Sequence, residues 1–166
     1  MDDPLVRELV EACTFPIALV GVGNPLRGDD GFGPAVLAAA PAHPAILPFE
    51  AGMAPENWLG PIARAGPATV LVLDATDLGE PPGTLRLLRP GELESVGVST
   101  HGLPLGFFLQ MVAERCSAPV LLLAVQPQNV AFDAPLSEPM RQAIHRAAAA
   151  IAALGRHAPP RPPEQG

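Results

Sequence analysis

The stretch Val20-Gly-Val-Gly-Asn-Pro-Leu-Arg-Gly-Asp-Asp-Gly-Phe-Gly33 decides how the N-terminal half of this chain folds. An apolar run over residues 17–20 leads into it, and residues 34–37 after it have helical character. Glycines suit a backbone that turns sharply or approaches another group closely. We therefore predict a strand, a tight loop and the start of a helix. Asp29 and Asp30 would lie at the carboxyl end of that strand, where open α/β sheets bind their ligands.

The loop begins like the dinucleotide-binding fingerprint G-x-G-x-x-G, with Gly21 and Gly23, but Leu26 occupies the position of the third glycine. Two carboxylates at the helix entrance would also repel a pyrophosphate, which binds at a bare helix N-terminus. Asp29 and Asp30 therefore favour a cation over a nucleotide phosphate as the ligand.

Apolar strands and amphipathic helices alternate along the rest of the chain. Residues 69–74 are almost continuously apolar, which is typical of a strand covered by helices on both faces. Further strands are expected at 17–22, 45–50 and 120–125, with an edge strand that can run antiparallel at 84–89; helices are expected at 4–13, 31–40, about 52–65, 105–116 and 137–154. We predict an α/β three-layer sandwich with a mostly parallel sheet of about five strands and helices on both faces.

The domain organisation is expected to be simple. Residues 1–155 form one domain, in which residues 1–15 carry an additional N-terminal helix. Residues 156–166 are rich in proline and cannot bury much surface, so we expect a disordered tail.

Charge and hydropathy limit the partners. The formal net charge is −7 and no basic stripe is visible, which disfavours nucleic acid and anionic membranes. No apolar run reaches the roughly 18 residues that a membrane span requires, and the N-terminus is acidic where a signal peptide would be basic. We expect a soluble cytoplasmic protein.

Three groups are expected at the same edge of the predicted sheet: the Asp29 and Asp30 pair, Asp74 at the end of its strand, and His101 ahead of a helix. Two carboxylates and one imidazole can hold a transition metal and leave positions open for water or substrate. Each also has a purely structural interpretation. Asp74 can cap a turn, His101 can begin the helix, and one of the paired aspartates can serve as an N-cap. We expect one of the two to turn into the loop and the other to face the site.

Other reactive side chains are interpreted as structural. Cys13 and Cys116 lie too far apart in sequence for a zinc knuckle or a disulfide framework, and they fit buried apolar positions better. No G-x-S-x-G elbow occurs, which argues against covalent serine catalysis. His43 lies in a Pro-Ala-His-Pro loop, and His145 and His157 fall on or after the last predicted helix, so they are not interpreted as functional.

Several blocks of the sequence together resemble the [NiFe]-hydrogenase maturation endopeptidases. They are residues 21–33, 54–57, 73–79, 82–83, 100–105 and 125–127, so the resemblance spans roughly residues 17 to 154. The later blocks are most similar to the branch that processes the large subunit of the formate-hydrogenlyase type of hydrogenase. The resemblance implies an endopeptidase that removes the C-terminal extension of the large-subunit precursor after nickel insertion.

In the family that the chain resembles, an acidic residue of the glycine loop, an aspartate at the end of the third strand and a histidine ahead of a later helix bind metal. These positions fall on Asp30, Asp74 and His101. The resemblance implies that they recognise the nickel already seated in the precursor, and that another divalent cation can replace it in the purified protein. A free carboxylate, Asp29 or Asp77, would hold the hydrolytic water. Asp29, Asp30, Asp74 and His101 are thus the catalytic candidates, the partner is the large-subunit precursor, and we expect a monomer.

Two other functions remain open at this stage. The chain could be a non-catalytic assembly factor that binds a metal or a nucleotide. It could also be a metal-dependent phosphohydrolase, because carboxylates at strand ends suit Mg²⁺. His101 argues against magnesium, since imidazole is a better ligand for nickel or zinc.

Overall fold

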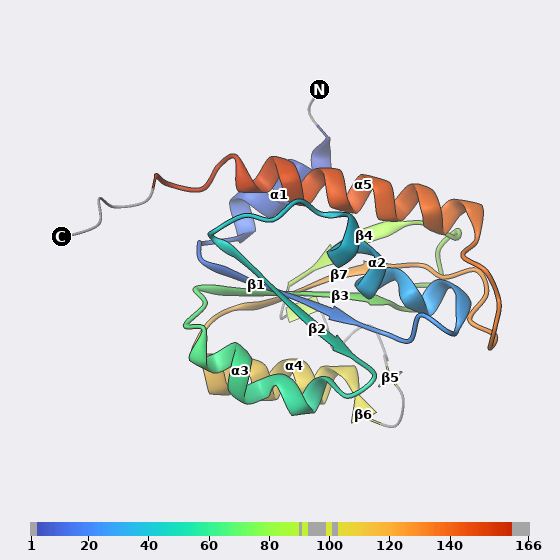
Figure 1. Cartoon of the computed structure of the whole chain (residues 1–166), viewed down its shortest axis with the longest axis horizontal. Helices are drawn as coiled ribbons and strands as arrows, with labels where there is room; N and C mark the ends of the chain where they lie inside the picture. The colour runs from blue at the N-terminus through green and yellow to red at the C-terminus, as the bar shows by residue number, and fades with distance from the viewer. Residues whose placement is uncertain (1–2, 90, 93–98, 101–102, 161–166) are drawn as a thin grey trace.

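A central sheet lies between two layers of helices in the computed structural model, which describes residues 3–89, 91–92, 99–100 and 103–160 (Figure 1). One face carries α1 (Pro4–Ala12), α2 (Phe32–Ala39) and α5 (Glu138–Gly155), and the other carries α3 (Leu59–Arg64) and α4 (Leu105–Cys116). The predicted α/β three-layer sandwich is confirmed.

The sheet has five strands in the order β2-β1-β3-β7-β4. β1 (Ile17–Val22), β2 (Ile46–Gly52), β3 (Thr69–Ala75) and β7 (Val120–Val125) are parallel, and β4 (Leu85–Leu88) pairs antiparallel with β7 at the edge. These elements match the predictions, including the antiparallel edge strand. The helix predicted at about residues 52–65 is divided into the 3₁₀ helix η2 (Pro55–Trp58) and α3. The 3₁₀ helix η1 (Gly28–Gly31) and the two-stranded ladder of β5 (Ser99–Thr100) and β6 (Leu103–Pro104) were not predicted, because segments this short show no periodicity.

The central strand β3 contributes to a hydrophobic core on each face of the sheet. Leu71 and Leu73 belong to the core beneath α1, α2 and α5, whereas Val70 and Val72 belong to the core beneath α3 and α4. Side chains of a strand alternate between the two faces. Asp74 therefore lies in phase with Val70 and Val72, on the side of α3 and α4.

Helix α2 approaches the sheet very closely at Gly33. A Cβ atom at this position would lie 2.5 Å from the Val22 carbonyl oxygen and 2.8 Å from the Leu73 carbonyl oxygen. Both neighbours are backbone atoms of the sheet, so they cannot move aside as a flexible side chain could. The absence of a side chain at Gly33 therefore sets how near the first turn of α2, and the loop before it, lie to β1 and β3.

Gly33→Ala should lower the free energy of unfolding by about 2 kcal/mol or more, because the added methyl group displaces α2 from the sheet. Gly106→Ala is the matched control: its Cβ would meet no atom within 4 Å, and the change from glycine to alanine within a helix should stabilise by about 0.5–1 kcal/mol. Urea unfolding of both variants tests this, and equal stabilities would contradict it.

The predicted N-terminal helix is present and is fastened to α5 by Asp3. The Asp3 side chain caps α1 by accepting a hydrogen bond from the Leu5 amide at 2.9 Å. Arg146 of α5 donates from Nε and Nη2 to the same carboxylate at 2.8 and 2.7 Å. This paired contact lowers the pKa of Asp3 to about 2.

Asp3→Asn should therefore destabilise the protein by about 1 kcal/mol at pH 7, a modest value because both partners are partly exposed to solvent. Asparagine keeps a capping oxygen, so the variant removes the charge pair selectively. The depressed pKa gives stability that is present above pH 4 and is lost as the pH falls towards 2. The difference between the two proteins, measured by denaturant unfolding, should shrink over that range, and a constant difference would contradict the assignment.

No helix in the described part of the chain is long and apolar enough to cross a membrane. The expected tail begins beyond α5, and its residues 161–166 lie outside the described residues. Its disorder stays a prediction.

Candidate functional site

The carboxyl ends of β1, β3 and β7 meet at one edge of the sheet, and the predicted aspartates lie there. Asp29 and Asp30 belong to η1, which follows β1, and Asp74 is the penultimate residue of β3. All three are buried. Asp30 and Asp74 come close enough for the negative charge of Asp30 to act on the Asp74 carboxyl group. The structure thus brings together two of the three residues proposed as metal ligands.

Asp74 is fully buried, and neither of its carboxylate oxygens has a hydrogen-bond partner among the described residues. Burial raises its pKa well above the ordinary value, and the charge of Asp30 raises it further. The nearby Ala75 amide lowers the pKa and so opposes this shift in part. The hydroxyl group of Thr76, also buried, lacks a partner in the described chain too. Such unpartnered oxygens are costly in a protein interior, so they indicate a ligand.

Asp30 is held by the glycine loop itself. Its Oδ2 accepts a hydrogen bond from the Asn24 amide at 2.9 Å. Gly23 has φ of 134°, and a Cβ there would lie 2.0 Å from the Asp30 carbonyl oxygen, so the close return of the loop requires glycine. Asp30 is 9% exposed whereas Asp74 is 0% exposed. Asp30 therefore marks the side from which a ligand reaches the pair.

Asp29 points away from this pair and binds the segment between β7 and α5. Its Oδ2 accepts hydrogen bonds from the amides of Gln128 (2.8 Å) and Asn129 (3.3 Å) and from the Ser137 hydroxyl (2.7 Å), and its Oδ1 accepts one from the Ser137 amide (2.8 Å). Burial alone would raise the pKa of Asp29, but these four donors hold it below its ordinary value. The two aspartates differ in role as expected, but Asp29 turns towards the segment after β7 and not into the glycine loop, which binds Asp30 instead. The interpretation of Asp29 as a free carboxylate is wrong.

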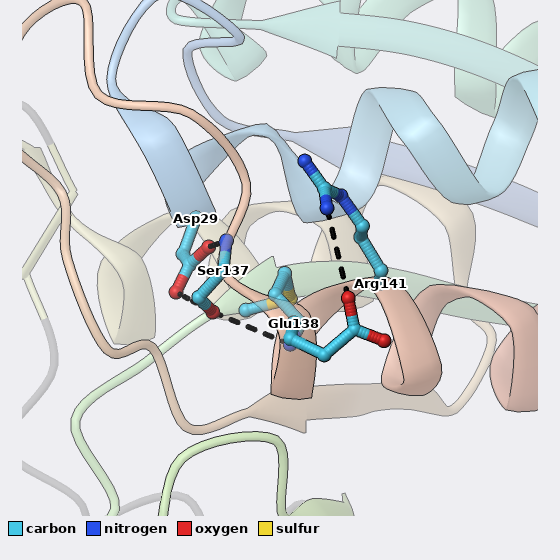
Figure 2. A network of polar contacts seen from close by, with 5 residues as sticks. Asp29, Ser137, Glu138 and Arg141 are labelled. Atoms are coloured by element: carbon cyan, nitrogen blue, oxygen red, sulfur yellow. Dashed lines mark hydrogen bonds and ion pairs between the residues drawn. The ribbon is translucent and has the colours of Figure 1, made fainter.

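Ser137 connects this anchor to α5, as Figure 2 shows. Its hydroxyl also accepts from the Met140 amide at 3.3 Å and so caps the helix. The neighbouring ion pair of Glu138 and Arg141, 3.6 Å apart, is exposed and adds little stability. Ser137 had been predicted to open the helix, but its contact with Asp29 could not be read from the sequence.

Asp29→Asn should lower the free energy of unfolding by about 2–4 kcal/mol, because an amide nitrogen would face backbone donors and leave them unpaired. Ser137→Ala is the matched comparison. It leaves the three backbone amides bound to Asp29 and should cost about 1 kcal/mol for the lost cap and hydroxyl contact. Thermal and urea unfolding measure both, and a smaller loss for Asp29→Asn than for Ser137→Ala would contradict the anchor.

Gln126, which sequence reasoning missed, fastens the loop after Asp74. Its Oε1 accepts from the amides of Leu78 (2.5 Å) and Glu80 (3.3 Å), and its Nε2 donates to Asp77 Oδ1 at 3.3 Å. Asp77 Oδ1 also accepts from the Gly79 amide at 3.1 Å. The Asp77 carboxylate, which was suggested to hold the hydrolytic water, therefore also accepts hydrogen bonds that fasten the loop after β3. The sequence signal was only a Gln-Pro pair directly after a strand.

His101 lies outside the described residues, so its part in the site stays a prediction. Its described neighbours Thr100 and Leu103 pair through their backbones in β5 and β6, shortly before α4 begins. Among the described residues, no three histidine, cysteine or acidic side chains form a group that could hold a metal ion. Asp30 and Asp74 are therefore the part of the proposed ligand set that the described chain supplies.

The cysteines fit the structural interpretation. Burial raises the pKa of Cys13 to about 12, and it also raises the pKa of Cys116. Since the thiolate is the nucleophilic form, neither side chain is suited to attack a peptide bond. The reactive groups of the described edge are oxygen atoms.

Fold and site together define an α/β protein with a buried carboxylate pair at the carboxyl edge of its sheet. A sequence model of the hydrogenase maturation protease family matches residues 39–154, a span that includes Asp74 and His101 but not the glycine loop. The Hydrogenase 3 maturation protease of Escherichia coli K12 is 35% identical over 130 residues, which cover 76% of this chain and 82% of the relative. The chain belongs to the hydrogenase maturation protease family and is an endopeptidase.

Solved structures agree with this assignment. The [NiFe] hydrogenase maturation protease HycI of Thermococcus kodakarensis KOD1 superposes with a TM-score of 0.81 at 30% identity, over 90% of this chain and 99% of that one. The hydrogenase maturating endopeptidase HybD of E. coli shares the fold, with a TM-score of 0.70 at 24% identity over 84% of this chain and 91% of that one.

Proposed function

We propose that this endopeptidase removes the C-terminal extension of a [NiFe]-hydrogenase large-subunit precursor, and that it recognises the nickel ion seated in that precursor through Asp30, Asp74 and His101. The substrate nickel would then mark which precursors are ready for trimming. We further propose that the enzyme acts as a monomer in the cytoplasm.

One observation carries the proposal: both oxygens of the buried Asp74 carboxylate lack partners in the described chain, and Asp30 lies beside it. Two ionised carboxylates held close together in a buried site repel one another. A divalent cation between them reverses that repulsion and supplies the ligand that the Asp74 oxygens lack. The pair thus suits a cation that arrives with the substrate.

The kind of cation follows from the donor set and the relatives. Two carboxylates alone would suit magnesium or calcium as well, whereas an imidazole from His101 shifts the preference to nickel or zinc. The printed name of the Thermococcus structure refers to a [NiFe] hydrogenase, and that of the E. coli relative refers to hydrogenase 3. The first name supports a nickel-containing hydrogenase precursor as the substrate of this chain, and the second supports a hydrogenase precursor.

The reaction class is peptide hydrolysis, and a cation in this position supplies Lewis-acid polarisation of a nearby carbonyl group. The protein's own contribution is orientation. The Asn24 amide fixes one oxygen of Asp30, so that the carboxylate keeps its direction when a ligand enters. The buried position of Asp74 excludes water from the pair and strengthens its electrostatic interactions.

Asp74→Asn should reduce precursor trimming by at least about 100-fold while leaving the free energy of unfolding unchanged or higher, because the variant removes a buried carboxylate without hydrogen-bond partners. Glu114→Gln is the matched control: it also replaces a carboxylate by an amide, at an exposed position of α4 with no assigned role in the site. Electrophoretic shortening of the precursor and urea unfolding measure both effects. Equal trimming by the wild type and Asp74→Asn would rule out the role of Asp74.

Nickel recognition is tested by incubating the wild-type enzyme with the same precursor prepared with and without nickel. Trimming should occur only with the nickel-loaded form, and His101→Ala should lose that activity as Asp30→Asn does. Trimming of the nickel-free precursor at the same rate would contradict nickel recognition while leaving the protease activity intact. Binding of the precursor without a shortened product would instead favour a non-catalytic assembly factor.

A further inference from the structure

The large hydrophobic side chains that remain exposed gather at one edge of the molecule. They are Leu26 (58% exposed), Met53 (54%), Phe107 (52%), Val130 (41%) and Phe132 (65%), and we call these five the apolar rim. Among the residues whose side-chain exposure the structure describes, no other large hydrophobic residue is exposed. Single exposed hydrophobics are ordinary, but a group confined to one region marks an interaction surface.

The apolar rim surrounds the carboxyl edge that holds Asp30 and Asp74. Leu26 belongs to the loop after β1, Met53 directly follows β2, and Phe107 lies in the first turn of α4. The remaining two belong to the segment between β7 and α5, which lies at the same edge (Figure 1). Leu26 is also joined to the site, because its amide donates to the Asn24 side chain at 3.0 Å and the Asn24 amide holds Asp30.

Part of the apolar rim is displayed by loops that are fastened to each other. The Asp133 amide donates to the Leu26 carbonyl oxygen at 2.8 Å, and Arg27 Nε donates to the Val130 carbonyl oxygen at 3.2 Å. Gly28 allows this approach, since a Cβ there would lie 2.5 Å from the Asn129 carbonyl oxygen. These hydrogen bonds fix the backbone of both loops before a partner arrives, which lowers the entropic cost of binding.

We propose that the apolar rim binds apolar side chains of the large-subunit precursor around its cleavage site. This inference rests on the proposed function, since the occupant is the same precursor. An endopeptidase must hold the polypeptide beside the scissile bond, and Leu26 of the rim is joined through Asn24 to Asp30. The net charge of −7 opposes nucleic acid and anionic membranes as alternative occupants.

The test is a Leu26→Ser/Phe132→Ser double variant, assayed with the nickel-loaded precursor of a formate-hydrogenlyase-type large subunit. KM should rise about tenfold or more with kcat within about threefold of the wild type, because the variant loses binding contacts and keeps both carboxylates. Ala149→Ser, an exposed change on α5, is the matched control and should leave both constants unaltered. Equal melting temperatures of the three proteins would exclude unfolding as the cause.

A second readout separates this inference from the proposed function. In an Asp74→Asn background, binding of the precursor should weaken about tenfold when the two rim substitutions are added. If Asp74→Asn itself trimmed the precursor normally, the proposed recognition of nickel through Asp74 would fail while the binding comparison still measured the rim. Unchanged KM and binding in the double variant would overturn the rim. The proposal would also be overturned if the wild type were a dimer, the double variant were a monomer and KM did not change. A second copy of the chain would then be the occupant of the rim.

Discussion

The buried Asp29 carboxylate is the interaction on which the architecture of this edge depends. Its two oxygens accept four hydrogen bonds from Gln128, Asn129 and Ser137, and these partners lie 99 to 108 residues further along the chain. The anchor joins the glycine loop after β1 to the segment after β7 and to the N-terminus of α5. A carboxylate with all its partners supplied by the protein is stable when ionised, and it is therefore structural.

The adjacent residue Asp30 faces the candidate site, whereas Asp29 is structural. The anchoring of Asp29 orients η1 so that Asp30 meets Asp74, whose oxygens lack partners in the described chain. The Asp29 oxygens thus accept hydrogen bonds that hold the fold together. Asp30 is directed towards a site in which the Asp74 oxygens lack partners in the described chain. Active sites commonly retain such unfavourable arrangements, because the surrounding fold holds them in place and the ligand relieves them.

The same anchor also relates the carboxylate pair to the surface around it. Loops that are tied together by Asp29, Arg27 and Asp133 carry Leu26, Val130 and Phe132 at the edge where Asp30 lies. The same rigid loops would then position both the carboxylates that recognise a cation and the side chains that recognise an apolar polypeptide segment. This arrangement suits a protease that acts on one folded precursor, since neither contact alone would select it.

The sequence by itself determined the layers. Local sequence patterns predicted the apolar strands β1, β3 and β7 and the amphipathic helices α1 and α5, and the structure confirmed them. The sequence also predicted aspartates at strand ends, and the structure places them there. Only the tertiary structure showed that Asp29 anchors the segment after β7, that Gln126 fastens the Asp77 loop, and that exposed hydrophobics surround one edge. The reason is physical: strand and helix patterns arise between near neighbours in sequence, whereas the partners of a buried carboxylate come from segments that meet only when the sheet has formed.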